Sequence, residues 1–130
     1  MEPSIKVTAF DHIVLKCADV ERTLSWYVDV LGLGPVRVDE WRRGEAPFPS
    51  ARVDAGTIID FIEGDPKPGR LDHLCLVITD TNLHELAASG VFEVVDGPGP
   101  RFGARGMGQS LYVLDPDGGV VELRHYSGGE

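Results

Sequence analysis

The chain contains an internal repeat, and this repeat limits its possible folds more than any other feature. The pattern apolar-Asp-His-apolar occurs at residues 10–13 and again at residues 71–74. A second echo pairs Gly-Thr-Ile-Ile-Asp at 56–60 with Gly-Gly-Val-Val-Glu at 118–122. His12 and Asp60 are 48 residues apart, and His73 and Glu122 are 49 apart. A repeat that preserves two polar residues at matched intervals predicts two copies of one supersecondary unit.

Each copy is predicted to run strand, helix and then three strands. Alternating apolar residues indicate strands, and apolar residues at helical spacing after Asp19 indicate a capped helix that ends at Gly32. In the first copy we expect strands at 8–17, 35–41, 47–54 and 57–63 and a helix at 20–31. In the second copy we expect strands at 71–79, 91–95, 109–115 and 120–126, with a helix from residue 80 or 81 to 89.

This order predicts one α+β domain over residues 1–130, with modules at about 8–63 and 71–126 and a polar linker at 64–70. Pro47 and Pro49 suggest that their strand lies at a sheet edge. The glycine-rich segment 97–108 is interpreted as a mobile loop.

Composition excludes several functional classes. The net charge of −9 argues against nucleic acid and against anionic membrane surfaces as partners. No run of about 18 apolar residues suggests a membrane span, and no signal peptide is recognised. Cys17 and Cys75 lie in apolar runs and are expected to be small buried residues in a reduced, cytoplasmic protein.

The repeated His and carboxylate residues suggest a metal site. If the first and last strands of each module are neighbours, His12 and Asp60 share one face, and His73 and Glu122 do likewise. Two such sheets would form a half-barrel around a lined hollow. Imidazole and carboxylate ligands together suit a borderline divalent cation, and four of them leave two exchangeable positions on an octahedral ion. Taken singly, each residue is more often an ordinary strand residue.

The sequence resembles the vicinal oxygen chelate superfamily, also called the glyoxalase, bleomycin-resistance and ring-cleaving dioxygenase group. The resemblance extends over residues 8–126 and includes its small, single-domain "virulence protein" branch. The segments that carry it are Phe-Asp-His-Ile at 10–13, Trp-Tyr-Val-Asp-Val-Leu-Gly-Leu at 26–33, Leu-Asp-His at 71–73, and residues 111–122 with their Asp-Pro-Asp-Gly turn.

The resemblance implies two tandem βαβββ modules forming a U-shaped cup around one divalent ion, which could be Zn, Ni, Mn, Co or Fe. By position, the ligands would be His12, Asp60, His73 and Glu122. Asp60 departs from the Glu of glyoxalase I-type members, so it would bind directly, bind through water, or support a ligand. Ring-cleaving dioxygenases use two His and one Glu, which this chain also offers.

Several functions remain open. One is a metal-dependent enzyme acting on a small oxygen-bearing substrate, either a lyase or isomerase with Asp60 or Glu122 moving a proton, or a ring-cleaving oxygenase. Tyr112, Arg105 and Phe102 are candidate substrate residues. The alternative is a non-catalytic protein that binds and sequesters a small, antibiotic-like molecule through its aromatic residues. A third is a metal-occupied protein without catalysis. The resemblance also implies a homodimer.

Overall fold

The structure is a computed structural model that describes residues 5–67, 69–114 and 118–126. The chain forms two compact units. We call residues 12–72 the central unit and residues 5–11 with 73–126 the terminal unit, after their places in the sequence. The chain passes between the units at the peptide bonds Asp11–His12 and Asp72–His73.

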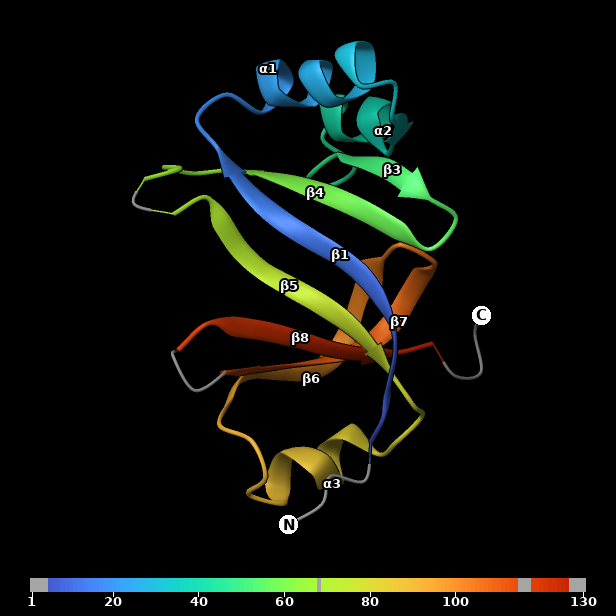
Figure 1. Cartoon of the computed structure of the whole chain (residues 1–130), viewed down its shortest axis with the longest axis vertical. Helices are drawn as coiled ribbons and strands as arrows, with labels where there is room; N and C mark the ends of the chain where they lie inside the picture. Colours follow the sequence, from blue (N-terminus) through green and yellow to red (C-terminus); the bar gives the residue numbers. More distant parts are fainter. Residues whose placement is uncertain (1–4, 68, 115–117, 127–130) are drawn as a thin grey trace. The chain divides into compact units, whose positions relative to one another are not determined.

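The central unit is a mixed sheet with helices packed against it. Its strands follow the order β2-β3-β4-β1, with β1 and β4 parallel and the other two pairs antiparallel. Figure 1 shows α1 and α2 together beside β3 and β4. Its elements are β1 (Val7–Cys17, here from His12), α1 (Val20–Ser25), the π-helix η1 (Trp26–Val30), β2 (Gly34–Val36), α2 (Val38–Arg42), β3 (Ser50–Asp54) and β4 (Thr57–Glu63).

The helix expected at 20–31 is present, but its winding changes along its length. Asp19 caps α1 by accepting a hydrogen bond from the Arg22 amide at 3.1 Å, as its place in the sequence predicted. From Trp26 the helix continues as the π-helix η1. Gly32 follows it with φ of 79°, which is the left-handed backbone expected of a glycine at a helix end.

The strand expected at 35–41 is wrong beyond its first residues. β2 ends at Val36, and Arg37 turns the chain in the left-handed region with φ of 57° before α2. Val38 and Trp41 are one helical turn apart and both pack against the core of the central unit, which favours the helix. The edge position expected for the strand at 47–54 is also wrong, because β3 lies between β2 and β4 and the prolines precede it.

The terminal unit repeats the same arrangement. Its strands follow the order β5-β8-β7-β6, with β5 and β8 parallel and the other two pairs antiparallel. The first half of β1 lies along β5, where the Thr8 hydroxyl donates to the Val77 carbonyl at 3.4 Å. Its elements are β5 (Leu71–Ile78, here from His73), α3 (Leu83–Ala88), β6 (Val94–Gly103), β7 (Gly106–Leu114) and β8 (Val120–His125).

The glycine-rich segment is a β-hairpin, so the expected loop at 97–108 is wrong. β6 and β7 pair in antiparallel fashion from Val94 with Val113 to Gly103 with Gly106. Register shifts between Asp96 and Gly99 accommodate Gly97, whose φ is 85°. Few large apolar side chains mark this strand, so hydropathy alone could not reveal it. The Asp-Pro-Asp turn at 115–117 lies outside the described residues.

Each unit has its own apolar core on one face of its sheet. In the central unit the core includes Leu15, Cys17, Leu24, Ala51 and Phe61. In the terminal unit it includes Ile78, Leu83, Leu86, Leu111, Val113 and Leu123. Cys17 and Cys75 are buried, as expected, and neither forms a disulfide. The α+β class and the repeated strand-helix-three-strand order are confirmed, with α2 as an additional helix between β2 and β3 of the central unit. Among the described residues, no helix has the length and apolarity needed to cross a membrane.

Candidate functional site

The central unit brings His12 and Asp60 together on the face opposite its core. Strand pairing sets His12 beside Ile58 and Val14 beside Asp60, so His12 and Asp60 point to the same side of the sheet. The His12 Nε2 atom is 3.6 Å from Asp60 Oδ2, and both side chains are only 2% exposed. The face shared by His12 and Asp60 is therefore confirmed.

Ser50 completes this cluster. It lies directly across from Asp60 on the neighbouring strand, and its hydroxyl donates to Asp60 Oδ1 at 2.5 Å. The bond occupies one carboxylate oxygen, while the other faces His12. A hydroxyl that bonds to an ionised carboxylate both orients it and offsets part of its loss of hydration.

The terminal unit repeats the arrangement with His73 and Glu122. Cys75 pairs with Glu122, and His73 lies two residues before Cys75 on the same face. The His73 Nε2 atom is 3.0 Å from Glu122 Oε1. Glu122 is buried, whereas His73 retains 11% exposure.

Glu122 is held by two donors on its other oxygen. The Ser110 hydroxyl donates to Oε2 at 2.7 Å, and Arg124 Nη1 donates to the same atom at 2.8 Å. Arg124 is itself fully buried and donates through Nη2 to the Arg101 carbonyl at 2.8 Å. Together these contacts leave Oε1 directed at His73.

These two pairs fit the ligand chemistry of a divalent metal. Two nitrogen or oxygen ligands about 2.1 Å from one ion are separated by about 3.0–3.4 Å for right or tetrahedral angles. The separations of 3.6 Å in the central unit and 3.0 Å in the terminal unit lie close to this range. In each pair the carboxylate's second oxygen is bound by a protein donor, as is usual for metal ligands.

A family model matches most of the chain. It covers residues 9–123 and describes the Glyoxalase/Bleomycin resistance protein/Dioxygenase superfamily. The chain belongs to this superfamily. The resemblance seen in the sequence is thereby confirmed, and the matched range includes both His–carboxylate pairs.

Two curated relatives match nearly the whole chain. A glyoxalase domain-containing protein, RDO1 of Mycosarcoma maydis, is 34% identical over 94% of this chain and 70% of its own. Virulence protein STM3117 of Salmonella typhimurium is 30% identical over 92% of this chain and 85% of its own. Among solved structures, methylmalonyl-CoA epimerase from Mycobacterium tuberculosis aligns with a TM-score of 0.61 at 20% identity, covering 96% of this chain and 92% of that one. This structural likeness shows the fold alone.

Tyr112 lies beside the terminal pair of this superfamily member. It is directly across from Glu122 on β7, and its ring meets the His73 ring edge-on with centroids 5.3 Å apart. Burial, reinforced by the negative charge of Glu122, raises the pKa of Tyr112 above its ordinary value of 10. The hydroxyl therefore stays protonated at neutral pH, and its hydrogen bond with Glu122 contributes to the raised pKa.

The other two predicted substrate residues lie at the end of the β6–β7 hairpin. Phe102 pairs with Met107, and its carbonyl accepts from Arg124 at 3.4 Å. Arg105 lies in the turn, with its guanidinium carbon 5.8 Å from the centroid of the Tyr126 ring. Tyr126 in turn donates to buried Asp11 at 2.5 Å.

Sequence reasoning missed Ser50, Ser110 and Arg124 as supporting residues. The serines form a third element of the internal repeat, one on the strand before each carboxylate. That echo was present in the sequence, but no known motif marks a single serine 10 or 12 residues before a carboxylate. Arg124 follows Glu122 by two residues, so strand alternation placed it on the same face.

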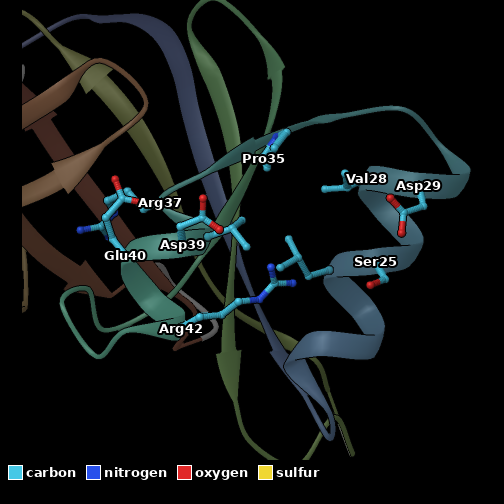
Figure 2. Close-up of a pocket in the computed structure, with 10 residues that line it drawn as sticks. Ser25, Val28, Asp29, Pro35, Arg37, Asp39, Glu40 and Arg42 are labelled. Carbon is cyan, nitrogen blue, oxygen red and sulfur yellow. The ribbon is translucent and has the colours of Figure 1, made fainter.

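The central unit also contains a polar cavity of about 460 Å³ that involves neither His12 nor Asp60. It lies between the α1–η1 helix and the β2–α2 segment, as Figure 2 shows. Its walls carry Ser25 and Asp29 on one side and Asp39 and Arg42 on the other. Arg42 donates to Glu21 from Nε at 3.0 Å and from Nη2 at 2.9 Å. The cavity thus has no ligand set like that of the His–carboxylate pairs.

Proposed function

We propose that this protein is a divalent-metal-dependent enzyme that acts on a small oxygen-bearing substrate. His12, Asp60, His73 and Glu122 would hold the ion. The observation that carries the proposal is that each unit buries a His–carboxylate pair whose second carboxylate oxygen is held by a strand serine. That both pairs bind the same ion is inferred from the internal repeat and from superfamily membership.

The residues divide the work by their contacts. A bound divalent ion would supply Lewis-acid polarisation of a substrate oxygen. Glu122 would serve as an anionic ligand, because the Arg124 guanidinium favours its ionised form. Asp60 accepts from Ser50 at Oδ1 and would move a proton at its Oδ2 atom, which faces His12. Tyr112 would orient the substrate with its protonated hydroxyl.

Two reaction classes suit this set of residues. A lyase or isomerase would use Asp60 or Glu122 to move a proton beside the metal. A ring-cleaving oxygenase would bind iron through His12, His73 and Glu122 and leave Asp60 as a support. The native metal separates these classes, since only the second needs iron.

The test is the metal content of purified, untagged protein, measured by plasma mass spectrometry. We expect about one equivalent of divalent metal per chain in the wild type and a loss of most of it in His73→Ala and His12→Ala. His84→Ala is the matched control, because His84 is exposed on α3 and is expected to keep the metal.

The outcomes separate the functions. Iron directs the assays to oxygen-dependent cleavage of a catechol, and nickel, zinc, cobalt or manganese directs them to isomerase or lyase chemistry. A wild-type protein that takes up no metal even after reloading would contradict the enzyme proposal and favour a protein that binds and sequesters a small molecule. Equal metal content in His73→Ala and wild type would contradict the assigned ligands.

The proposal includes a homodimer, in keeping with the superfamily resemblance. Light scattering coupled to size exclusion should give twice the 14.1 kDa mass of the chain. The monomer mass at micromolar concentration would contradict it.

A further inference from the structure

Arg101 lies on the same face of the terminal sheet as the His73–Glu122 pair. It pairs with Gly108 on β7, and Gly108 shares its face with Ser110 and Tyr112 by strand alternation. The Arg101 guanidinium carbon is 5.6 Å from the centroid of the Tyr112 ring. A cation at this distance from an aromatic face is attracted by the ring while its N–H edges remain directed outward.

Gly99 leaves room for this position. It lies two residues before Arg101 on β6 and pairs with Ser110, which is the next residue toward Tyr112 on the same face of β7. A Cβ atom at Gly99 would be 3.1 Å from Arg101 Nη1, a tight contact that would shift the guanidinium slightly. The arginine side chain therefore extends along β6 over a glycine.

The ion pair of Arg101 is weak and exchangeable. Nη2 is 3.3 Å from Asp96 Oδ2, in an ion pair whose arginine is 36% exposed and whose aspartate is 65% exposed. Such solvent-exposed pairs contribute little to stability. Nη1 donates to the carbonyl of the adjacent Pro100 at 2.8 Å. An incoming carboxylate can replace Asp96 at modest cost, because one ion pair is exchanged for another.

Tyr112 connects this cation to the proposed metal ligands. Its ring lies 5.3 Å from the His73 ring and 5.6 Å from the guanidinium carbon of Arg101, so arginine and imidazole are at most about 11 Å apart. Tyr112 is also directly across from Glu122. A small molecule is therefore long enough to reach from Arg101 to the proposed metal ligands His73 and Glu122.

The other arginines of the described part of this unit are placed differently. Arg124 is fully buried and bound to Glu122. Arg105 stacks on Tyr126, which follows Glu122 by four residues, or about 13 Å along an extended strand. Arg101 combines partial exposure with a position beside the pair.

We infer that Arg101 binds an anionic group of the substrate, so that the substrate is a small acid with a carboxylate several bonds from its metal-binding oxygens. This inference rests on the proposed function, because it takes His73 and Glu122 as metal ligands. Arg101 determines specificity through affinity for the acid over its neutral analogue, while Tyr112 holds the guanidinium in place. Arg105 is then a residue of the hairpin turn.

The test compares two probes that differ by one carboxylate. 3,4-Dihydroxybenzoate and catechol share the vicinal oxygens, and only the first has an anionic group on the far side of its ring. Isothermal titration calorimetry on zinc-loaded protein at neutral pH gives Kd for each. In the wild type we expect 3,4-dihydroxybenzoate to bind about tenfold more tightly, as expected for one charge-assisted hydrogen bond.

The variants distinguish the arginines. Arg101→Gln should reduce the ratio of the two Kd values to near one while leaving the Kd for catechol unchanged. Arg105→Gln, an equally polar change on an exposed residue of the same hairpin, should keep the wild-type ratio. Asp96→Asn should raise the ratio, because it removes the competing carboxylate. A merely structural role of Arg101 would change both Kd values together.

Each contrary result identifies which proposal fails. If zinc does not bind the wild type, the proposed function fails and this inference fails with it. If zinc is retained and both probes bind equally, this inference alone is overturned. The same holds if the ratio persists in Arg101→Gln, if Arg105→Gln abolishes it, or if Asp96→Asn leaves it unchanged or lower.

Discussion

The two His–carboxylate pairs occupy matching places in their sheets but differ in how the carboxylate is held. In the central unit the Ser50 hydroxyl donates to Asp60, and in the terminal unit Ser110 donates to Glu122 together with the buried Arg124. The repeat therefore preserved the hydroxyl, while the cation differs: Arg124 donates directly to Glu122, and Arg37 acts on Asp60 through its charge. The direct hydrogen bond from Arg124 favours the ionised form of Glu122.

Each unit also has an arginine–glutamate pair, and the two pairs differ in their burial. Arg42 and Glu21 of the central unit are each 50% exposed, whereas Arg124 and Glu122 of the terminal unit are fully buried. Solvent screens the first pair and not the second. We therefore expect the same two side-chain types to contribute little to stability in one unit and several kcal/mol, about 3–5, in the other.

The largest effect is expected for Arg124→Met. This change leaves the buried Glu122 charge without its cation and should lower the free energy of unfolding by about 3–5 kcal/mol. Urea denaturation of metal-free protein measures it. The control is Arg124→Met with Glu122→Gln, which removes both charges and should recover most of the loss. A loss below about 1 kcal/mol in the single variant would break the comparison.

A smaller effect is expected at the two serines. Ser50→Ala removes a hydrogen bond to a buried carboxylate and should cost about 1.5–3 kcal/mol. Ser110→Ala should cost only about 1 kcal/mol, because Arg124 still donates to the same Glu122 oxygen. The same denaturation experiment gives both values. A greater loss from Ser110→Ala than from Ser50→Ala would show that Arg124 does not compensate.

Alkaline pH should destabilise the terminal unit through its tyrosines. Burial raises the pKa values of Tyr112 and Tyr126 above 10, and donation to Asp11 contributes at Tyr126. Above about pH 10 an unfolded tyrosine loses its proton while the folded one keeps it, so the folded state binds more protons. The contribution of these tyrosines to the free energy of unfolding is therefore fully present below about pH 10. The free energy falls as the pH rises above 10, by up to about 1.4 kcal/mol per pH unit for each tyrosine.

Unfolding free energies measured from pH 8 to about 11 test this slope. Tyr126→Phe and Tyr112→Phe should each make the alkaline slope shallower, whatever they cost at neutral pH. Identical slopes in the wild type and both variants would refute the assignment.

The smallest effect is expected for Arg42→Ala. Despite two short hydrogen bonds to Glu21, the exposed pair should contribute only about 0.2–1 kcal/mol. Its contribution should also fall at high salt, whereas that of Arg124 should change little. A loss comparable to that of Arg124→Met would mean that burial is not what separates the two pairs.

The glycine-rich segment shows where local patterns mislead. Its glycines read as a loop, yet two of them make space for Arg124 within a hairpin. A Cβ atom at Gly103 would lie 2.5 Å from Arg124 Cζ, and one at Gly108 would lie 2.7 Å from Arg124 Nη2. Such positions require glycine because of a side chain some 20 residues away along the chain, which no local window contains.

The sequence by itself determined the repeated element order, the α+β class and the pairing of His12 with Asp60 and of His73 with Glu122. It could do so because strand alternation has a period of two, and a repeat carries both partners to the same face. The tertiary structure decided which residues hold the carboxylates, namely Ser50, Ser110 and Arg124, and which arginine lies over Tyr112. Those partners depend on the register between neighbouring strands, and register is set by turns, bulges and core packing along the whole sheet.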